Sequence, residues 1–167
     1  VNAIAGWRGE GSWYHVANPI NGIFSGTTDG GAGTSPLDGY NAAAVNNFGH
    51  ILYQTLTETI QPNTTYTLTV LVGHRIGVPI DDVSVNLVSG DRFMARAFPH
   101  PAEDAFVPLT LVYHSPESGG LIGQQFQIEL RSAGTIAQGW FDDVHLYADS
   151  SPVGTVAERP RRELVEC

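Results

Sequence analysis

The sequence contains no lysine, and its single cysteine is the last residue, Cys167. Without lysine the chain cannot form a Schiff base through a side-chain amine, anchor pyridoxal phosphate or bind a phosphate with a P-loop lysine. One cysteine excludes an internal disulfide and a zinc site built on cysteine pairs. These absences remove several large classes of enzyme from consideration.

Charged residues are scarce as well, at 15% of the 167 residues, whereas an average protein has about 25%. The formal net charge of −9 argues against a surface that binds nucleic acid. No run approaches the ~20 apolar residues that a membrane-spanning helix needs. Hydrophobic residues still make up 42% of the chain, which is enough for the core of one ordinary domain.

Alternation of apolar and polar residues is the strongest pattern in the chain. A strand places successive side chains on opposite faces, so alternation predicts a strand with one buried face. In residues 65–72 the apolar side chains of one face are those of Tyr66, Leu68, Val70 and Val72. Comparable segments lie at residues 3–7, 13–16, 42–46, 51–56, 83–87, 92–97, 107–113, 126–130 and 139–147.

The spacing of these segments predicts the fold class and the domain boundary. About ten short strands joined by turns are typical of an all-β protein, a two-sheet antiparallel jelly-roll sandwich. The sandwich is expected to span residues 1–149. Residues 150–167 are expected to form a linker and a charged C-terminal tail, which is a short helix, a mobile extension or a docking segment. Residues 25–39 are rich in glycine and lack periodicity, so they predict a long loop.

The last expected strand carries the most specific chemical signal. By alternation Trp140, Asp142, Val144 and Leu146 share one face, and the aliphatic pair suggests that this face is the core side. A carboxylate among apolar neighbours is costly unless it is paired, bound to a metal or protonated. Three roles are therefore open for Asp142: a cap for backbone N–H groups of an adjoining loop, a calcium ligand with backbone carbonyl groups, or a general acid with a raised pKa.

Aromatic residues near the start of the chain are candidates for ligand binding. Flat rings stack on sugars and other ring ligands, but they also fill sandwich cores. Trp7 is expected in the core. Trp13 and Tyr14 are consecutive in an expected strand, so they point to opposite faces and at most one of them is buried. The other, together with Tyr40, is available to a ligand.

Three segments resemble galactose-binding-like β-sandwiches of secreted bacterial proteins. They are residues 62–75 (PNTTYTLTVLVGHR), 121–130 (LIGQQFQIEL) and 141–146 (FDDVHL). The resemblance extends over about residues 7–147. Carbohydrate-binding modules of the xylanase-associated type are similar in the closing strand and often bind calcium. Stig cyclases, which make hapalindole-type indole alkaloids, are similar along the same span.

The resemblance to Stig cyclases implies a calcium-stabilised dimer in which an acidic residue of the closing strand protonates the substrate. By motif position that residue is Asp142, and Tyr14, Tyr40 and Phe98 would line an apolar pocket. Such domains usually open with an Asn-x-x-Phe-Glu strand whose glutamate helps to hold calcium, whereas this chain starts after that point. A missing first strand would leave an open sheet edge, to which a second chain could add a strand.

The interpretation favoured by the sequence is a secreted, extracellular and non-catalytic binding module for carbohydrate, stabilised by calcium. Its ligand would lie against Trp13, Tyr14 and Tyr40. One alternative is a Stig-type cyclase that uses Asp142 as general acid on an indole-alkaloid precursor. Another is a structural subunit that forms a homo-oligomer or polymer by strand complementation. No group of residues requires a catalytic role, so this interpretation favours a protein that is not an enzyme.

Overall fold

The computed structural model describes residues 6–10, 14–17, 24, 41–46, 49–150 and 162–166. Trp13, Tyr40, Cys167 and the loop expected at residues 25–39 lie outside the described residues. No helix in the described part of the chain is both long enough and apolar enough to cross a membrane.

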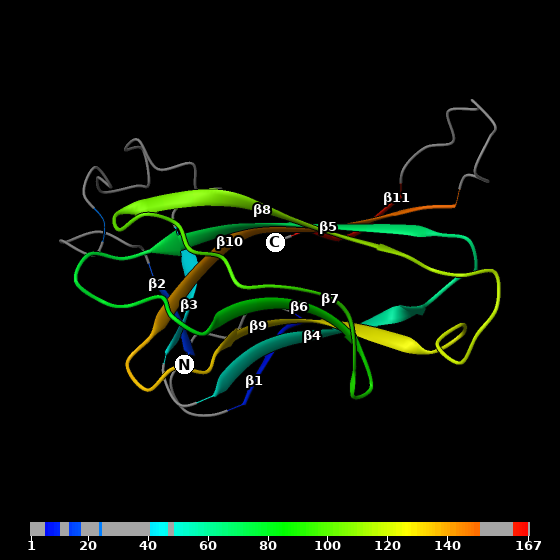
Figure 1. Ribbon diagram of the computed structural model, residues 1–167, viewed down its shortest axis with the longest axis horizontal. Coiled ribbons are helices and arrows are strands. Elements are labelled where there is room, and N and C mark those ends of the chain that lie inside the picture. Colours follow the sequence, from blue (N-terminus) through cyan, green and yellow to red (C-terminus); the bar gives the residue numbers. More distant parts are fainter. Residues whose placement is uncertain are drawn as a thin grey trace.

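Eleven strands in the described residues form two antiparallel sheets, which lie one above the other in Figure 1. The smaller sheet has the order β1 (Arg8–Glu10), β4 (His50–Thr59), β9 (Gln125–Ser132), β6 (Val83–Ser89) and β7 (Arg92–Ala97). The larger sheet has the order β2 (Tyr14–Ala17), β3 (Ala42–Asn46), β10 (Gln138–Asp149), β5 (Thr65–His74) and β8 (Ala105–His114), and β11 (Arg162–Glu166) pairs with β10. The predicted all-β sandwich is confirmed.

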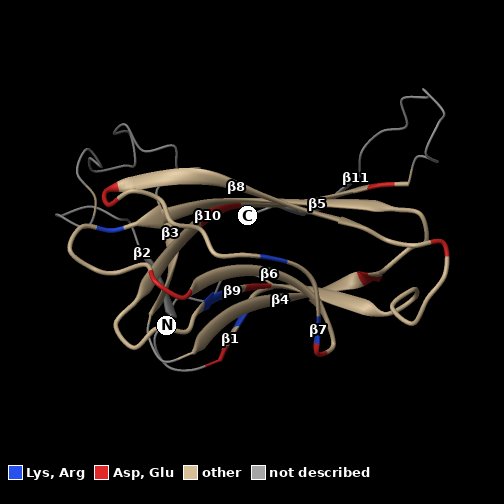
Figure 2. Cartoon of the chain, viewed as in Figure 1, with Lys and Arg blue, Asp and Glu red and all other residues tan. Residues whose placement is uncertain are grey.

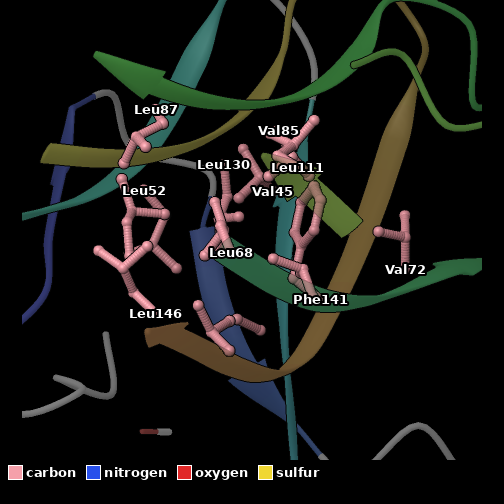
Figure 3. Packing of buried hydrophobic residues seen from close by; sticks show 14 of the residues in the cluster. Val45, Leu52, Leu68, Val72, Val85, Leu87, Leu111, Leu130, Phe141 and Leu146 are labelled. Carbon is pink, nitrogen blue, oxygen red and sulfur yellow. The ribbon is translucent and has the colours of Figure 1, made fainter. Parts of the chain in front are cut away.

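The main hydrophobic core lies between the two sheets, where side chains from both layers point toward one another (Figure 3). The alternation in β5 predicted its inner face correctly, because Tyr66, Leu68, Val70 and Val72 all belong to this core. Trp7 also lies there, as expected. Burial of these side chains supplies the main force that holds the sheets together, at about 25 cal/mol for each Å² of apolar surface removed from water.

One edge of β10 is paired with two different strands. Trp140 lies opposite Ala44 of β3 on one side and Gly73 of β5 on the other. Further along, Leu146 lies opposite Val165 of β11, again with β5 on the other side. Therefore β3 and β11 share the same edge of β10. The C-terminal segment, for which a short helix or an extension was expected, contains a strand.

Candidate functional site

A β-bulge interrupts β10 at its two consecutive aspartates. Asp142 pairs with Leu71 of β5, and His145 pairs with Thr69, so three steps along β10 match two steps along β5. The extra residue is accommodated by Asp143, whose φ of 50° lies in the left-handed region. Aspartate adopts this region more readily than most residues do. The bulge changes which side chains of β10 face the core.

The bulge places Asp142 on the opposite face from the one that alternation predicted. Phe141, Val144 and Leu146 belong to the core between the sheets. Trp140 belongs to a separate cluster, and Asp142 follows it two residues later, before the register shift. Asp142 and Trp140 therefore share the outer face of the larger sheet. The prediction that they share the core face with Val144 and Leu146 is wrong, because period two holds only until the extra residue.

The outer face of the larger sheet carries a second buried apolar cluster. Its buried members are Phe24, Ala42, Ala44 and Trp140, and Phe106 of β8 packs against them. The Phe24 ring stands edge-on to Trp140 with centroids 5.9 Å apart, and it lies 4.5 Å from the Phe106 ring. Two small alanines of β3 leave room for these rings beside the sheet. This set of five residues is called the outer aromatic cluster below.

Gly73 of β5 makes space for the outer aromatic cluster. It pairs with Trp140 on one side and with Phe106 on the other. A Cβ atom at this position would lie 2.4 Å from Cε1 of Phe106, far closer than van der Waals contact permits. The absence of a side chain at Gly73 therefore allows the Phe106 ring to lie over the strand.

Asp142 lies at one end of the outer aromatic cluster and is only 8% exposed. It follows Trp140 by two residues on the same face, and two strand residues span about 7 Å. The next aspartate has a different setting, because Oδ1 of Asp143 forms an ion pair with Nε2 of His145 at 2.6 Å. Both aspartates lie in the acidic segment of β10 (Figure 2). A buried carboxyl beside aromatic rings is suited to proton transfer to an apolar substrate.

The structure places the backbones of two residues predicted for the site. Tyr14 begins β2, and its backbone pairs with Val45 of β3, so its role in ligand binding stays a prediction. Phe98 follows β7 of the other sheet and is half-exposed, with its ring 4.3 Å from the guanidinium carbon of Arg96. Phe98 thus lies beside Arg96, and its place in a pocket with Asp142 stays a prediction. Sequence reasoning missed Phe106 and Gly73, whose proximity depends on the pairing of β5 with β8.

The described residues do not assemble an acidic metal centre. Among them, no three His, Cys, Asp or Glu side chains lie close enough together to hold a metal ion. Calcium prefers several oxygen ligands, usually including more than one carboxylate. Asp142 and its described neighbours do not provide such a set. Calcium binding thus stays a prediction that rests on the family resemblance.

The two-sheet architecture defines the class of jelly-roll β-sandwiches, which includes carbohydrate-binding modules. A family model described as HpiC1 cyclase matches residues 1–147, so the chain belongs to the HpiC1-like cyclase family. A comparison with curated protein sequences gives no match.

Two solved cyclase structures from Fischerella sp. TAU are similar to the chain. The Stig cyclase Fisc, in complex with (3Z)-3-(1-methyl-2-pyrrolidinylidene)-3H-indole, is 23% identical with a TM-score of 0.69, covering 89% of this chain and 87% of that chain. A cyclase in complex with 4-(1H-indol-3-yl)butan-2-one is 23% identical with a TM-score of 0.71, covering 92% and 89%. The CBM22-1 xylan-binding domain of Paenibacillus barcinonensis Xyn10C is 11% identical with a TM-score of 0.54, covering 88% of each chain.

These comparisons correct the function that the sequence favoured. The family is one of cyclases, and the two cyclase structures match the chain better than the xylan-binding domain does. The interpretation as a non-catalytic carbohydrate-binding module is therefore wrong, and so is the inclination against an enzyme. The resemblance to Stig cyclases is confirmed.

Proposed function

We propose that the protein is a cyclase that acts on an indole-class substrate and uses Asp142 as its general acid. The observation that carries this proposal is the position of a nearly buried carboxyl group on the same face as the outer aromatic cluster. Membership of the cyclase family supports it. Further support comes from the two similar cyclase structures, both in complex with indole compounds.

The reaction begins with transfer of a proton from Asp142. The protonated carboxyl group donates to a carbon–carbon double bond of the substrate, which leaves a carboxylate and a carbocation. A second double bond of the same substrate attacks the cation, and a new carbon–carbon bond closes the ring. The resulting cation then loses a proton to the carboxylate, which restores the acid. The first step requires Asp142 to hold a proton when the substrate binds.

The aromatic rings beside Asp142 stabilise the cationic intermediates. The faces of Trp, Tyr and Phe attract a cation through the ring quadrupole, by about 0.5–2 kcal/mol. Phe106 is only partly buried, so its ring is the accessible part of the outer aromatic cluster. Trp140 is fully buried, and the Phe24 ring packs edge-on against it.

The test is turnover of the indole–isonitrile precursor that Stig cyclases convert. We expect the wild-type protein to form a cyclised isomer of unchanged mass, and Asp142→Asn to lose about 10²–10⁴-fold in kcat. Asp143→Asn is the matched control, because it removes the neighbouring carboxylate and keeps a residue that tolerates positive φ. It should retain activity within a few-fold of wild type.

Two results would contradict the proposal. One is unchanged turnover by Asp142→Asn, which would mean that another group supplies the proton. The other is the absence of any product from the wild-type protein with this precursor, while calorimetry with 4-(1H-indol-3-yl)butan-2-one shows no binding either. Circular dichroism of each variant checks that the β-sandwich has formed.

A further inference from the structure

A hydrogen-bonded network of polar side chains lies at the other end of the outer aromatic cluster. Gln138 of β10 is buried, and its Oε1 accepts a hydrogen bond from Nε1 of Trp140 at 2.7 Å. The same oxygen accepts one from Nη1 of Arg75 at 3.1 Å. Nε2 of Gln138 donates to Oδ1 of Asn46 on β3. These bonds fix the orientation of the Gln138 amide and place the Arg75 guanidinium next to the indole of Trp140.

The charge of Arg75 is only partly compensated. The side chain is half-buried, and its Nε is buried without a hydrogen-bond acceptor among the described residues. No carboxylate in that part of the chain forms an ion pair with it. Its one described partner is a neutral amide oxygen. A guanidinium that has been drawn away from water without an anionic partner is unfavourable, so an oxygen acceptor that reaches its exposed edge would bind strongly.

Arg75 and Asp142 lie at opposite ends of the same face. Gln138, which holds Arg75, is four residues before Asp142 on β10, a separation of about 13 Å along a strand. Trp140 lies between them, together with Phe24 and Phe106. The face therefore presents a cation at one end, aromatic rings in the middle and a carboxyl group at the other end.

We infer that Arg75 determines substrate specificity by binding an oxygen acceptor on the side chain of an indole-class ligand. This inference rests on the proposed function of the face. The planar guanidinium donates two parallel hydrogen bonds to a carboxylate and also binds a carbonyl oxygen. The site then prefers an indole that carries such a group over one whose side chain is hydrocarbon alone.

Calorimetry with three ligands of matched size tests this inference without turnover. They are 3-butylindole, 4-(1H-indol-3-yl)butan-2-one and 3-(1H-indol-3-yl)propanoate, which carry no acceptor, a carbonyl and a carboxylate. For the wild-type protein we expect the ketone to bind about tenfold more tightly than 3-butylindole, and the carboxylate to bind at least as tightly as the ketone. Arg75→Met should remove this preference, so that the ketone and the carboxylate bind no more tightly than 3-butylindole does. Arg75→Lys, which keeps the charge but loses the planar fork, should retain part of it.

Arg131 offers a matched control. It also has a buried Nε without an acceptor among the described residues, but it lies on β9 of the other sheet. Arg131→Met should therefore keep the wild-type order of affinities. Equal affinity of the wild-type protein for all three ligands would overturn the inference about Arg75, although it would still support an indole-binding site. This result needs only the wild-type protein, so it does not depend on whether the variants fold. Failure of every ligand to bind would overturn the indole site and this role of Arg75 together.

Discussion

The backbone of Gly73 and the ring of Phe106 lie so close together that Gly73 has no room for a side chain. A Cβ atom on Gly73 would lie 2.4 Å from Cε1 and 2.6 Å from Cζ of Phe106. The clash would involve an aromatic ring that packs against Phe24, so the ring could not move without disturbing the outer aromatic cluster. We expect Gly73→Ala to lower the free energy of unfolding by about 1–3 kcal/mol, as overpacking does in other proteins.

A double-mutant cycle in urea denaturation checks the cause. Phe106→Leu removes the ring atoms that a Cβ would meet, so Gly73→Ala should cost less in the Phe106→Leu background than in wild type. Gly120→Ala is the control, because a Cβ there meets nothing within 4 Å. Additive effects of the two substitutions would contradict this account of the packing.

The bulge at Asp143 predicts a difference between two small substitutions. Asp143→Gly and Asp143→Ala both remove the carboxylate that pairs with His145, so they differ only in the backbone freedom of residue 143. At a φ of 50°, alanine raises the free energy of the folded state by about 1–2 kcal/mol because of its Cβ atom, whereas glycine does not. Asp143→Ala should therefore unfold at a lower urea concentration than Asp143→Gly. Equal midpoints would mean that residue 143 does not adopt the left-handed conformation.

The same bulge shows how far the sequence alone could lead. Period two predicted the strands and the inner face of β5 because a buried face needs regular alternation. It assigned Asp142 to the wrong face because a bulge adds one residue without any change in composition. The partners of Asp142 on the outer face could not be predicted either. Phe106 and Gly73 come together only through the pairing of β5 with β8, which a local pattern does not encode.

Calcium binding is expected from the family resemblance. The surroundings of Asp142 lead to a prediction about whether this residue is a calcium ligand. Asp142 lies beside aromatic rings, and no cluster of three potential ligands occurs among the described residues. If calcium binds, we expect a chelator to lower the melting temperature of wild type and of Asp142→Asn by the same amount. Scanning calorimetry with and without added calcium measures this. A shift in wild type that disappears in Asp142→Asn would identify Asp142 as a ligand instead of the acid.

The buried phenol of Tyr66 makes the stability of the protein depend on pH in alkaline solution. Burial of its side chain in the core raises the pKa of the phenol above its ordinary value of 10.0. The backbone N–H of Gln61 donates a hydrogen bond to its oxygen at 2.7 Å, which opposes the shift but does not cancel it. The folded protein thus retains the phenol proton at a pH where the unfolded chain has lost it.

The sign follows from proton linkage. Because the folded state binds more protons than the unfolded state above pH 10, the free energy of unfolding falls as the pH rises through that range. The contribution of Tyr66 is complete below pH 10 and is lost toward the pKa of the folded state. Tyr66→Phe should be less stable near neutral pH, by about 1–3 kcal/mol for the unpaired N–H group, yet its stability should fall less steeply above pH 10. Urea midpoints measured from pH 8 to about 11.5 report both effects. Tyr53→Phe of β4 is the control. Parallel curves of stability against pH for wild type and Tyr66→Phe would show that the folded state does not hold this proton.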